Sequence, residues 1–290
     1  MVTYTPEALL HGTEPGAWGE AQAITYTERD VLLYAVGIGC ADLRFVYERH
    51  TSFAVFSTFA IRWGGGGSLP DAHALPPSPG PLTLDAERFI ERIAPLPLSG
   101  TVQVRSRLIS VHPRGKGNAF IEKESEVTSD AGTVCVRMIS GAYRRGVERL
   151  GDIAPFEGRG RPPAAKIEPP ARPPDINVSA LIANNQAELY RLSGDYNPLH
   201  IDPEAARFGG FRSPILHGLC TYGHCGQMLL GALCDGDPAR FSSLKVRFSS
   251  PVYPGDDLRV LGWHDGPGRL VFEARVHDLT VVSNAVFSYF

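Results

Sequence analysis

The chain has 290 residues, of which 43% are hydrophobic and 20% are charged, as in a globular protein with a sizeable core. Its formal net charge of −3 gives no reason to expect nucleic acid or an anionic membrane as a partner. No apolar run of roughly 18 residues occurs, and the N-terminal sequence lacks the pattern of a signal peptide. We therefore expect a cytoplasmic location, or a peroxisomal one in a eukaryote, although the last residues show no peroxisomal tail. The five cysteines have no paired spacing, which predicts reduced thiols, most of them in the core.

The first half of the chain predicts two helices and several strands. Thr27 and Asp30 have the spacing of a capping box, which marks the start of a short helix. The apolar segment Ser52–Trp63 predicts a longer helix. Residues 117–127 and 133–143 alternate apolar and polar positions, which is typical of half-buried antiparallel strands.

Two segments are expected to be irregular. Gly64–Gly80 is rich in glycine and proline, which predicts a mobile loop. Arg161–Pro174 reads RPPAAKIEPPARPP, and neither a helix nor a strand tolerates so many prolines. We predict an N-terminal repeat in residues 1–150, a proline-rich linker in 151–174 and a C-terminal repeat in 175–290.

The second half predicts a similar set of elements. Pro203 is suited to the first position of a short helix that runs to Phe208. Leu219–Leu233 predicts a long apolar helix, and residues 268–276 and 280–290 have the alternation of strands.

Two matches between the halves share one offset. Leu32–Gly39 resembles Glu188–Asp195, and Pro95–Val104 resembles Pro251–Val260, so that 188 − 32 and 251 − 95 both give 156. We interpret this as a duplication. It predicts an α+β fold of two repeats, each with an antiparallel sheet wrapped around a long central helix.

The stretch SGDYNPLHIDPEAA places a carboxylate and an imidazole on one tight loop. Asp195 and His200 flank Asn197-Pro198, a pair that favours a turn. A carboxylate and an imidazole held on one loop can share a water and each handle one proton. A structural loop with Asn197 as a turn former is the alternative.

The first repeat acts as an internal control for this loop. At the offset of 156 residues, Gly39 stands opposite Asp195 and Arg44 stands opposite His200. The first repeat therefore keeps the scaffold without the acid and base, which favours a site over a requirement of the fold.

Gly218 lies where the long helix of the second half begins. The first backbone N–H groups of a helix have no internal partner and carry the positive end of its dipole. A glycine there lets a ligand oxygen approach the backbone, although glycine also serves packing. Such a site suits chemistry beside a carbonyl, for example addition of water to a double bond conjugated to a thioester.

Two stretches carry a resemblance to a known family. YRLSGDYNPLHIDPEAA and GFRSPILHGLCTYG together resemble the hydratase 2 motif of MaoC-like (R)-specific enoyl-CoA hydratases. From about Tyr26 onward, the chain is similar to their two-repeat form, the hydratase part of peroxisomal multifunctional enzymes. The resemblance implies a double hot-dog fold whose first repeat has lost its site and helps to enclose the acyl chain. It also implies reversible hydration of a trans-2-enoyl-CoA to the (R)-3-hydroxyacyl-CoA.

The resemblance also implies roles for individual residues. Asp195 and His200 would activate the water and exchange the alpha proton, Asn197 would hold the loop and water, and the Gly218 N–H would bind the thioester oxygen. No metal or redox cofactor is expected, CoA is part of the substrate, and a homodimer is the expected assembly. Further candidates for contact with the acyl-CoA are Tyr196, His217, Leu219, Arg247 and Phe248.

Several alternatives stay open on the sequence alone. LDAERF (Leu84–Phe89) and HPRGKG (His112–Gly117) depart from the family pattern in the half that shapes the acyl pocket, so the acyl group is not defined. Arg114–Gly117, and the pair Lys245 and Arg247, could bind CoA phosphates or simply be solvated. A metal site at His217, Cys220 and His224 is the less favoured interpretation of their helical spacing.

Three other functions compete with enoyl-CoA hydration. The first is a dehydratase of 3-hydroxyacyl thioesters in a biosynthetic pathway for fatty acids, polyketides or steroid-related compounds. That enzyme could take its substrate on acyl carrier protein. The second is a thioesterase, and the third is a non-catalytic acyl-CoA-binding subunit.

Overall fold

The structure is a computed structural model that describes residues 16–64, 66–67, 69, 75, 82–115, 117–147, 155–157 and 166–290. Most of the predicted loop Gly64–Gly80 lies outside these residues, as do residues 151–154 and 158–165 of the predicted linker. No helix in the described ranges is both long enough and apolar enough to cross a membrane.

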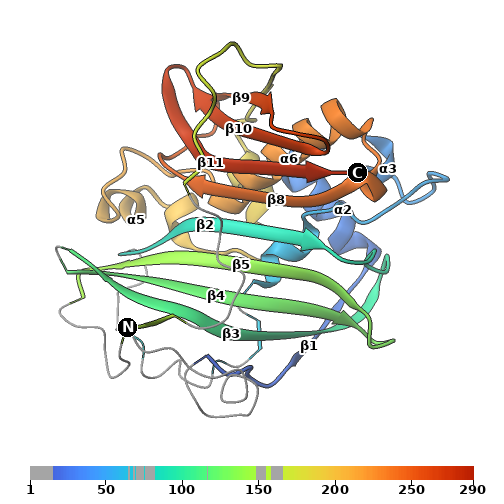
Figure 1. Ribbon diagram of the computed structural model, residues 1–290, viewed down its shortest axis with the longest axis horizontal. Helices are drawn as coiled ribbons and strands as arrows, with labels where there is room; N and C mark the ends of the chain where they lie inside the picture. Colours follow the sequence, from blue (N-terminus) through green and yellow to red (C-terminus); the bar gives the residue numbers. More distant parts are fainter. Residues whose placement is uncertain are drawn as a thin grey trace.

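The described strands form one antiparallel sheet in which two halves have the same strand order (Figure 1). The first half has the order β1-β3-β4-β5-β2, and the second has the order β7-β9-β10-β11-β8. The two halves join where β2 pairs with β8, and a short strand β6 pairs with β3. The strand bounds are β1 Gln22–Tyr26, β2 Thr83–Arg92, β3 Gly100–Arg114, β4 Asn118–Ser129, β5 Val134–Arg145, β6 Phe156–Glu157, β7 Ile176–Leu181, β8 Phe241–Phe248, β9 Asp257–His264, β10 Arg269–Val276 and β11 Leu279–Tyr289.

This shared order confirms the double hot-dog fold. The strands predicted from alternation correspond to β4, β5, β10 and β11 within a few residues at each end. The turn between β4 and β5 contains Gly132 at φ +78°, a conformation that glycine adopts without steric cost.

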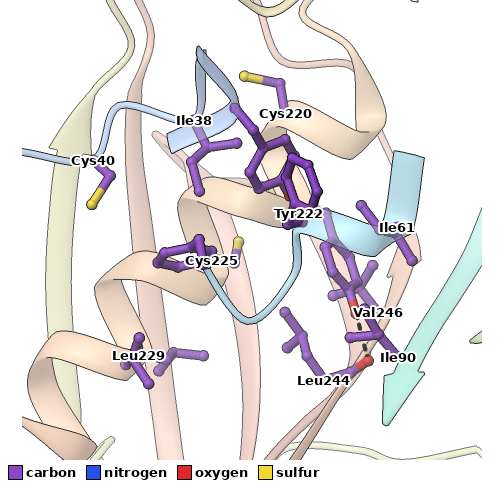
Figure 2. Packing of buried hydrophobic residues seen from close by; sticks show 14 of the residues in the cluster. Ile38, Cys40, Ile61, Ile90, Cys220, Tyr222, Cys225, Leu229, Leu244 and Val246 are labelled. Atoms are coloured by element: carbon purple, nitrogen blue, oxygen red, sulfur yellow. Dashed lines mark hydrogen bonds between the residues drawn. The ribbon is translucent and has the colours of Figure 1, made fainter. Parts of the chain in front are cut away.

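A long helix, α6 (Gly218–Cys234), lies against the second half of the sheet, as predicted for Leu219–Leu233. Most of its residues are buried on every side, which is typical of a core helix. Figure 2 shows Tyr222 of this helix donating a hydrogen bond of 2.7 Å to the carbonyl oxygen of Leu244 on β8. Ile38 from the first repeat packs on the same helix, because a Cβ added at Gly223 would meet its side chain at 2.2 Å.

The described residues of the first repeat contain no counterpart of this helix, and the prediction of a helix over Ser52–Trp63 is wrong. Only a 3₁₀ turn, η1 (Phe59–Trp63), forms there. The segment is rich in aromatic and β-branched residues, which have low helix propensity. Its apolar side chains are buried without a helix, and the Thr58 side chain forms a 2.8 Å hydrogen bond with the Tyr34 hydroxyl.

The short helices of the two repeats pack against each other. They are α2 (Glu28–Gly37) and α4 (Gln186–Arg191), and the rings of Tyr34 and Tyr190 have centroids 6.2 Å apart. The Gln186 side chain crosses this contact and donates to the Gly37 carbonyl at 2.5 Å. The capping box predicted at the start of α2 is confirmed. The other helices with described bounds are α3 (Leu43–Val46), α5 (Pro203–Phe208), as predicted, and the 3₁₀ turns η4 (Pro198–His200) and η5 (Pro238–Arg240).

All five cysteines are free and buried, as expected for reduced core thiols. Three of them, Cys40, Cys220 and Cys225, appear in Figure 2 among the apolar side chains around α6. Burial raises the pKa of the Cys225 thiol to about 12, so this thiol stays protonated and unreactive near neutral pH.

Candidate active site

The loop between α4 and α5 brings Asp195 and His200 together. Gly194 enters the loop at φ +115°, which a side chain would strain. The Asn197 carboxamide oxygen accepts the Leu199 N–H at 3.1 Å, and Pro198 takes the first position of η4. The Asp195 carboxylate accepts the Asn197 N–H at 3.2 Å, so backbone contacts on both sides of the proline fix the turn.

His200 is oriented by a backbone carbonyl. Its Nδ1 lies 2.9 Å from the Ile215 oxygen, and because a carbonyl can only accept, Nδ1 carries the hydrogen. A neutral ring then has its lone pair on Nε2. Burial lowers the pKa of His200, although the Ile215 contact and the charge of Asp195 oppose this. His200 is thus a neutral proton acceptor near neutral pH.

His217 lies behind this pair and supports both members. Its ring stacks on His200 with centroids 3.7 Å apart and an interplanar angle of 26°, and its other neighbour is Tyr190 at 4.9 Å. Its Nε2 donates to the backbone oxygen of Asp195 at 3.2 Å. Burial first, and then the charge of His200, lower the pKa of His217 to about 4. These contacts tie the His217 ring to the loop that carries Asp195 and His200.

Asp195, His200 and His217 each offer one polar side-chain atom, and these three atoms lie within 4.8 Å of one another, a spacing that a metal ion could bridge. Each imidazole has one nitrogen already hydrogen-bonded to a backbone carbonyl, which leaves one nitrogen each. The metal site considered from the sequence was a different group, His217, Cys220 and His224. The Cys220 thiol instead donates a hydrogen bond to the Gly37 carbonyl oxygen. The expectation that no metal is needed remains a prediction.

Asp195 and His200 face a cavity of about 660 Å³ that residues from both repeats line. Gly218, Asn197, Leu219 and Phe248 also line it. Gly218 is the first residue of α6, where the backbone N–H has no partner within the helix. A Cβ at this position would lie 3.4 Å from the Phe248 ring, so the glycine keeps the cavity wall open beside the helix N-terminus.

Other sequence candidates lie elsewhere. Tyr196 is 59% exposed and its ring lies 4.9 Å below the Arg191 guanidinium, outside the cavity lining. Arg247 binds the Glu87 carboxylate across the β2–β8 junction. Lys245 is buried at that junction, so the prediction that its side chain is solvated is wrong.

The sequence did not reveal the polar wall that the first repeat contributes to the cavity. Asp85, Arg88, Lys123 and Ser140 line it. The only signal was the departure at LDAERF, which contains the first two of these residues but says nothing of the strands that complete the wall.

Comparison with known proteins agrees with this arrangement. Residues 165–286 match the model of the MaoC like domain, and residues 24–146 match that of the MFE-2 hydratase 2 N-terminal domain. A 3-hydroxyacyl-thioester dehydratase Y of Mycobacterium tuberculosis is 35% identical over 90% of this chain and 90% of its own. A probable enoyl-CoA hydratase 2 of Dictyostelium discoideum is 33% identical over 87% and 86%. The chain belongs to the MaoC-like family.

Two further proteins are similar to this chain over most of its length. The peroxisomal multifunctional enzyme type 2 of Drosophila melanogaster is 37% identical over 90% of this chain, which spans only 45% of that enzyme. The crystal structure of a MaoC-like dehydratase from Phytophthora capsici has a TM-score of 0.81, is 36% identical, and covers 94% of this chain and 96% of its own.

Proposed function

We propose that this MaoC-like chain is a hydro-lyase that adds water reversibly to a trans-2-enoyl-CoA and forms the (R)-3-hydroxyacyl-CoA. The observation that carries the proposal is the placement of Asp195 and a neutral His200 beside the N-terminus of α6 on one cavity. The names of the relatives, an enoyl-CoA hydratase 2 and a 3-hydroxyacyl-thioester dehydratase, support this chemistry.

The proposed step uses these groups in order. The Gly218 N–H binds the thioester oxygen, and a water is held between the Asp195 carboxylate and Nε2 of His200. The water oxygen bonds to C3 while His200 takes its proton, and the electron pair of the C2–C3 double bond moves to the thioester oxygen as an enolate. His200 then returns the proton to C2, which leaves His200 neutral and Asp195 ionised, as before the reaction. Because one base removes and returns the proton, water adds to one face of the double bond.

Kinetics of hydration with several trans-2-enoyl-CoAs, followed by chiral analysis of the product, test the proposal. We expect the (R) product, and a loss of turnover by roughly a hundredfold or more in Asp195→Asn and His200→Gln with their thermal melts retained. Full turnover in either variant would exclude the roles given to these residues. Release of free thiol would instead identify a thioesterase.

A dehydratase that consumes (R)-3-hydroxyacyl thioesters is the second candidate, because the same residues catalyse both directions. The name of the Mycobacterium tuberculosis relative favours it. Comparing kcat/KM for CoA-linked and carrier-protein-linked substrates separates the two. Tight binding of acyl-CoA without turnover in either direction would point to a binding subunit. The same proposal includes a homodimer and a cytoplasmic or peroxisomal location. It includes no cofactor other than the CoA of the substrate.

A further inference from the structure

Three side chains form a polar row across the first repeat and face the cavity. Strand pairing sets Ser140 of β5 opposite Arg88 of β2 on one side and opposite Lys123 of β4 on the other. Directly paired residues of neighbouring strands share one face of a sheet. All three line the cavity that contains Asp195 and His200.

A β-bulge adds a carboxylate to this row. The register of β2 and β5 shifts between Asp85 and Glu87, so Ala86 is the extra residue. Asp85 and Arg88 are three positions apart and would point to opposite faces of a regular strand, but the bulge returns Asp85 to the cavity face. The Arg88 Nε then donates to both Asp85 oxygens at 2.9 Å. Arg88 and Asp85 thus satisfy each other.

Lys123 is the cation that remains in the row. Its side chain makes no hydrogen bond or ion pair with any residue in the described part of the chain, and the opposite charge that raises its pKa is Asp85. Burial and the charges of Arg88 and Arg144 lower its pKa. A partly buried cation without an ion pair is costly, and an anion supplied by a ligand would lower that cost.

The position of the row shows which part of an acyl-CoA would reach it. Asp195 and His200 line the same cavity as the row, so an acyl group held for reaction in that cavity also faces the row. The phosphates of CoA are separated from the thioester by the whole pantetheine arm and cannot lie there at the same time. An anion that pairs with Lys123 during the reaction would therefore have to be carried by the acyl chain itself.

We propose that the acyl chain of the substrate bears a carboxylate beyond the double bond, and that this carboxylate pairs with Lys123. The inference rests on the proposed hydration of enoyl thioesters and adds the class of acyl group. Arg88, fixed by Asp85, and the Ser140 hydroxyl would complete the binding of the carboxylate oxygens.

The test compares three series of trans-2-enoyl-CoAs of equal chain length that end in a carboxylate, a hydroxyl or a methyl group. In the wild-type protein, kcat/KM should favour the carboxylate series by about ten- to hundredfold at one chain length, the effect of a charge-assisted hydrogen bond. Lys123→Met should lose this preference and keep its turnover of the methyl series. Lys245→Met, which removes a buried lysine outside the cavity lining, should change all three series by one common factor.

Two outcomes overturn the inference while the proposed function stands. One is a preference for the methyl or hydroxyl series at every length, and the other is an unchanged carboxylate preference in Lys123→Met. If no enoyl-CoA is hydrated, the proposed function fails. Equilibrium binding of the saturated ω-carboxyacyl and methyl-ended acyl-CoAs then still measures the preference of the cavity, and equal Kd values refute the role of Lys123.

Discussion

Protonation of His217 should destabilise the protein in mild acid. The ring is 1% exposed, stacks on His200 and donates to the Asp195 backbone, while its Nδ1 has no hydrogen-bond partner among the described residues, so a positive charge there is costly. The test is to replace His217 with glutamine, which keeps a hydrogen-bond donor but does not titrate.

The size and sign of the effect follow from the pKa of His217. Burial lowers this pKa from 6.5 to about 4 in the folded protein, whereas the unfolded chain keeps the ordinary value. Between these values the unfolded state binds more protons, so the free energy of unfolding rises with pH. The contribution is complete above about pH 6.5 and is lost as the pH falls towards 4. At 1.36 kcal/mol for each unit of pKa, the loss is about 3 kcal/mol.

Urea unfolding of both proteins at steps from pH 7 to pH 4 measures this difference. The wild type should lose up to about 3 kcal/mol more than His217→Gln over this range. Because the comparison concerns the change with pH, a constant destabilisation of the variant does not affect it. Parallel pH profiles for the two proteins would refute the reasoning.

Three further predictions concern packing and the site. Gly223→Ala puts a methyl group 2.2 Å from the Ile38 side chain and should lower the free energy of unfolding by about 1–3 kcal/mol. Gly231→Ala on the same helix meets nothing within 4 Å and should raise it by up to about 1 kcal/mol, so equal effects in urea would contradict this packing. Gly218→Ala should fold, since its Cβ lies at ordinary contact distance from Phe248. Its kcat/KM for hydration should nevertheless fall by about tenfold or more. Unchanged kinetics would exclude close approach of the thioester oxygen to this backbone. Dialysis against EDTA should leave turnover unchanged, whereas loss of activity restored by a divalent cation would identify a metal bound by the carboxylate and two histidines.

The sequence predicted the parts of the fold whose signals are local. Apolar alternation located β4, β5, β10 and β11, and the long apolar run located α6. The helix expected over Ser52–Trp63 failed because burial alone does not require a helix. In that segment, β-branched and aromatic residues pack as an irregular chain with one 3₁₀ turn.

The site was predictable only where one loop carries it. Asp195, Asn197 and His200 lie within six positions, and turn chemistry shows that they can meet. The wall opposite depends on the pairing of three strands and on one bulge, which no short stretch of sequence specifies. The same is true of the Glu87 and Arg247 pair, since it forms only where the two repeats join.

The central claim is that His200, with the water held by the Asp195 carboxylate, adds that water to an enoyl thioester. Hydration of a trans-2-enoyl-CoA in D₂O, with NMR analysis of the product, tests it most directly. The account predicts an (R)-3-hydroxyacyl-CoA with one deuterium at C2, added to the same face as the hydroxyl, and no such product from Asp195→Asn. Deuterium and hydroxyl on opposite faces, or unchanged formation by this variant, would contradict it.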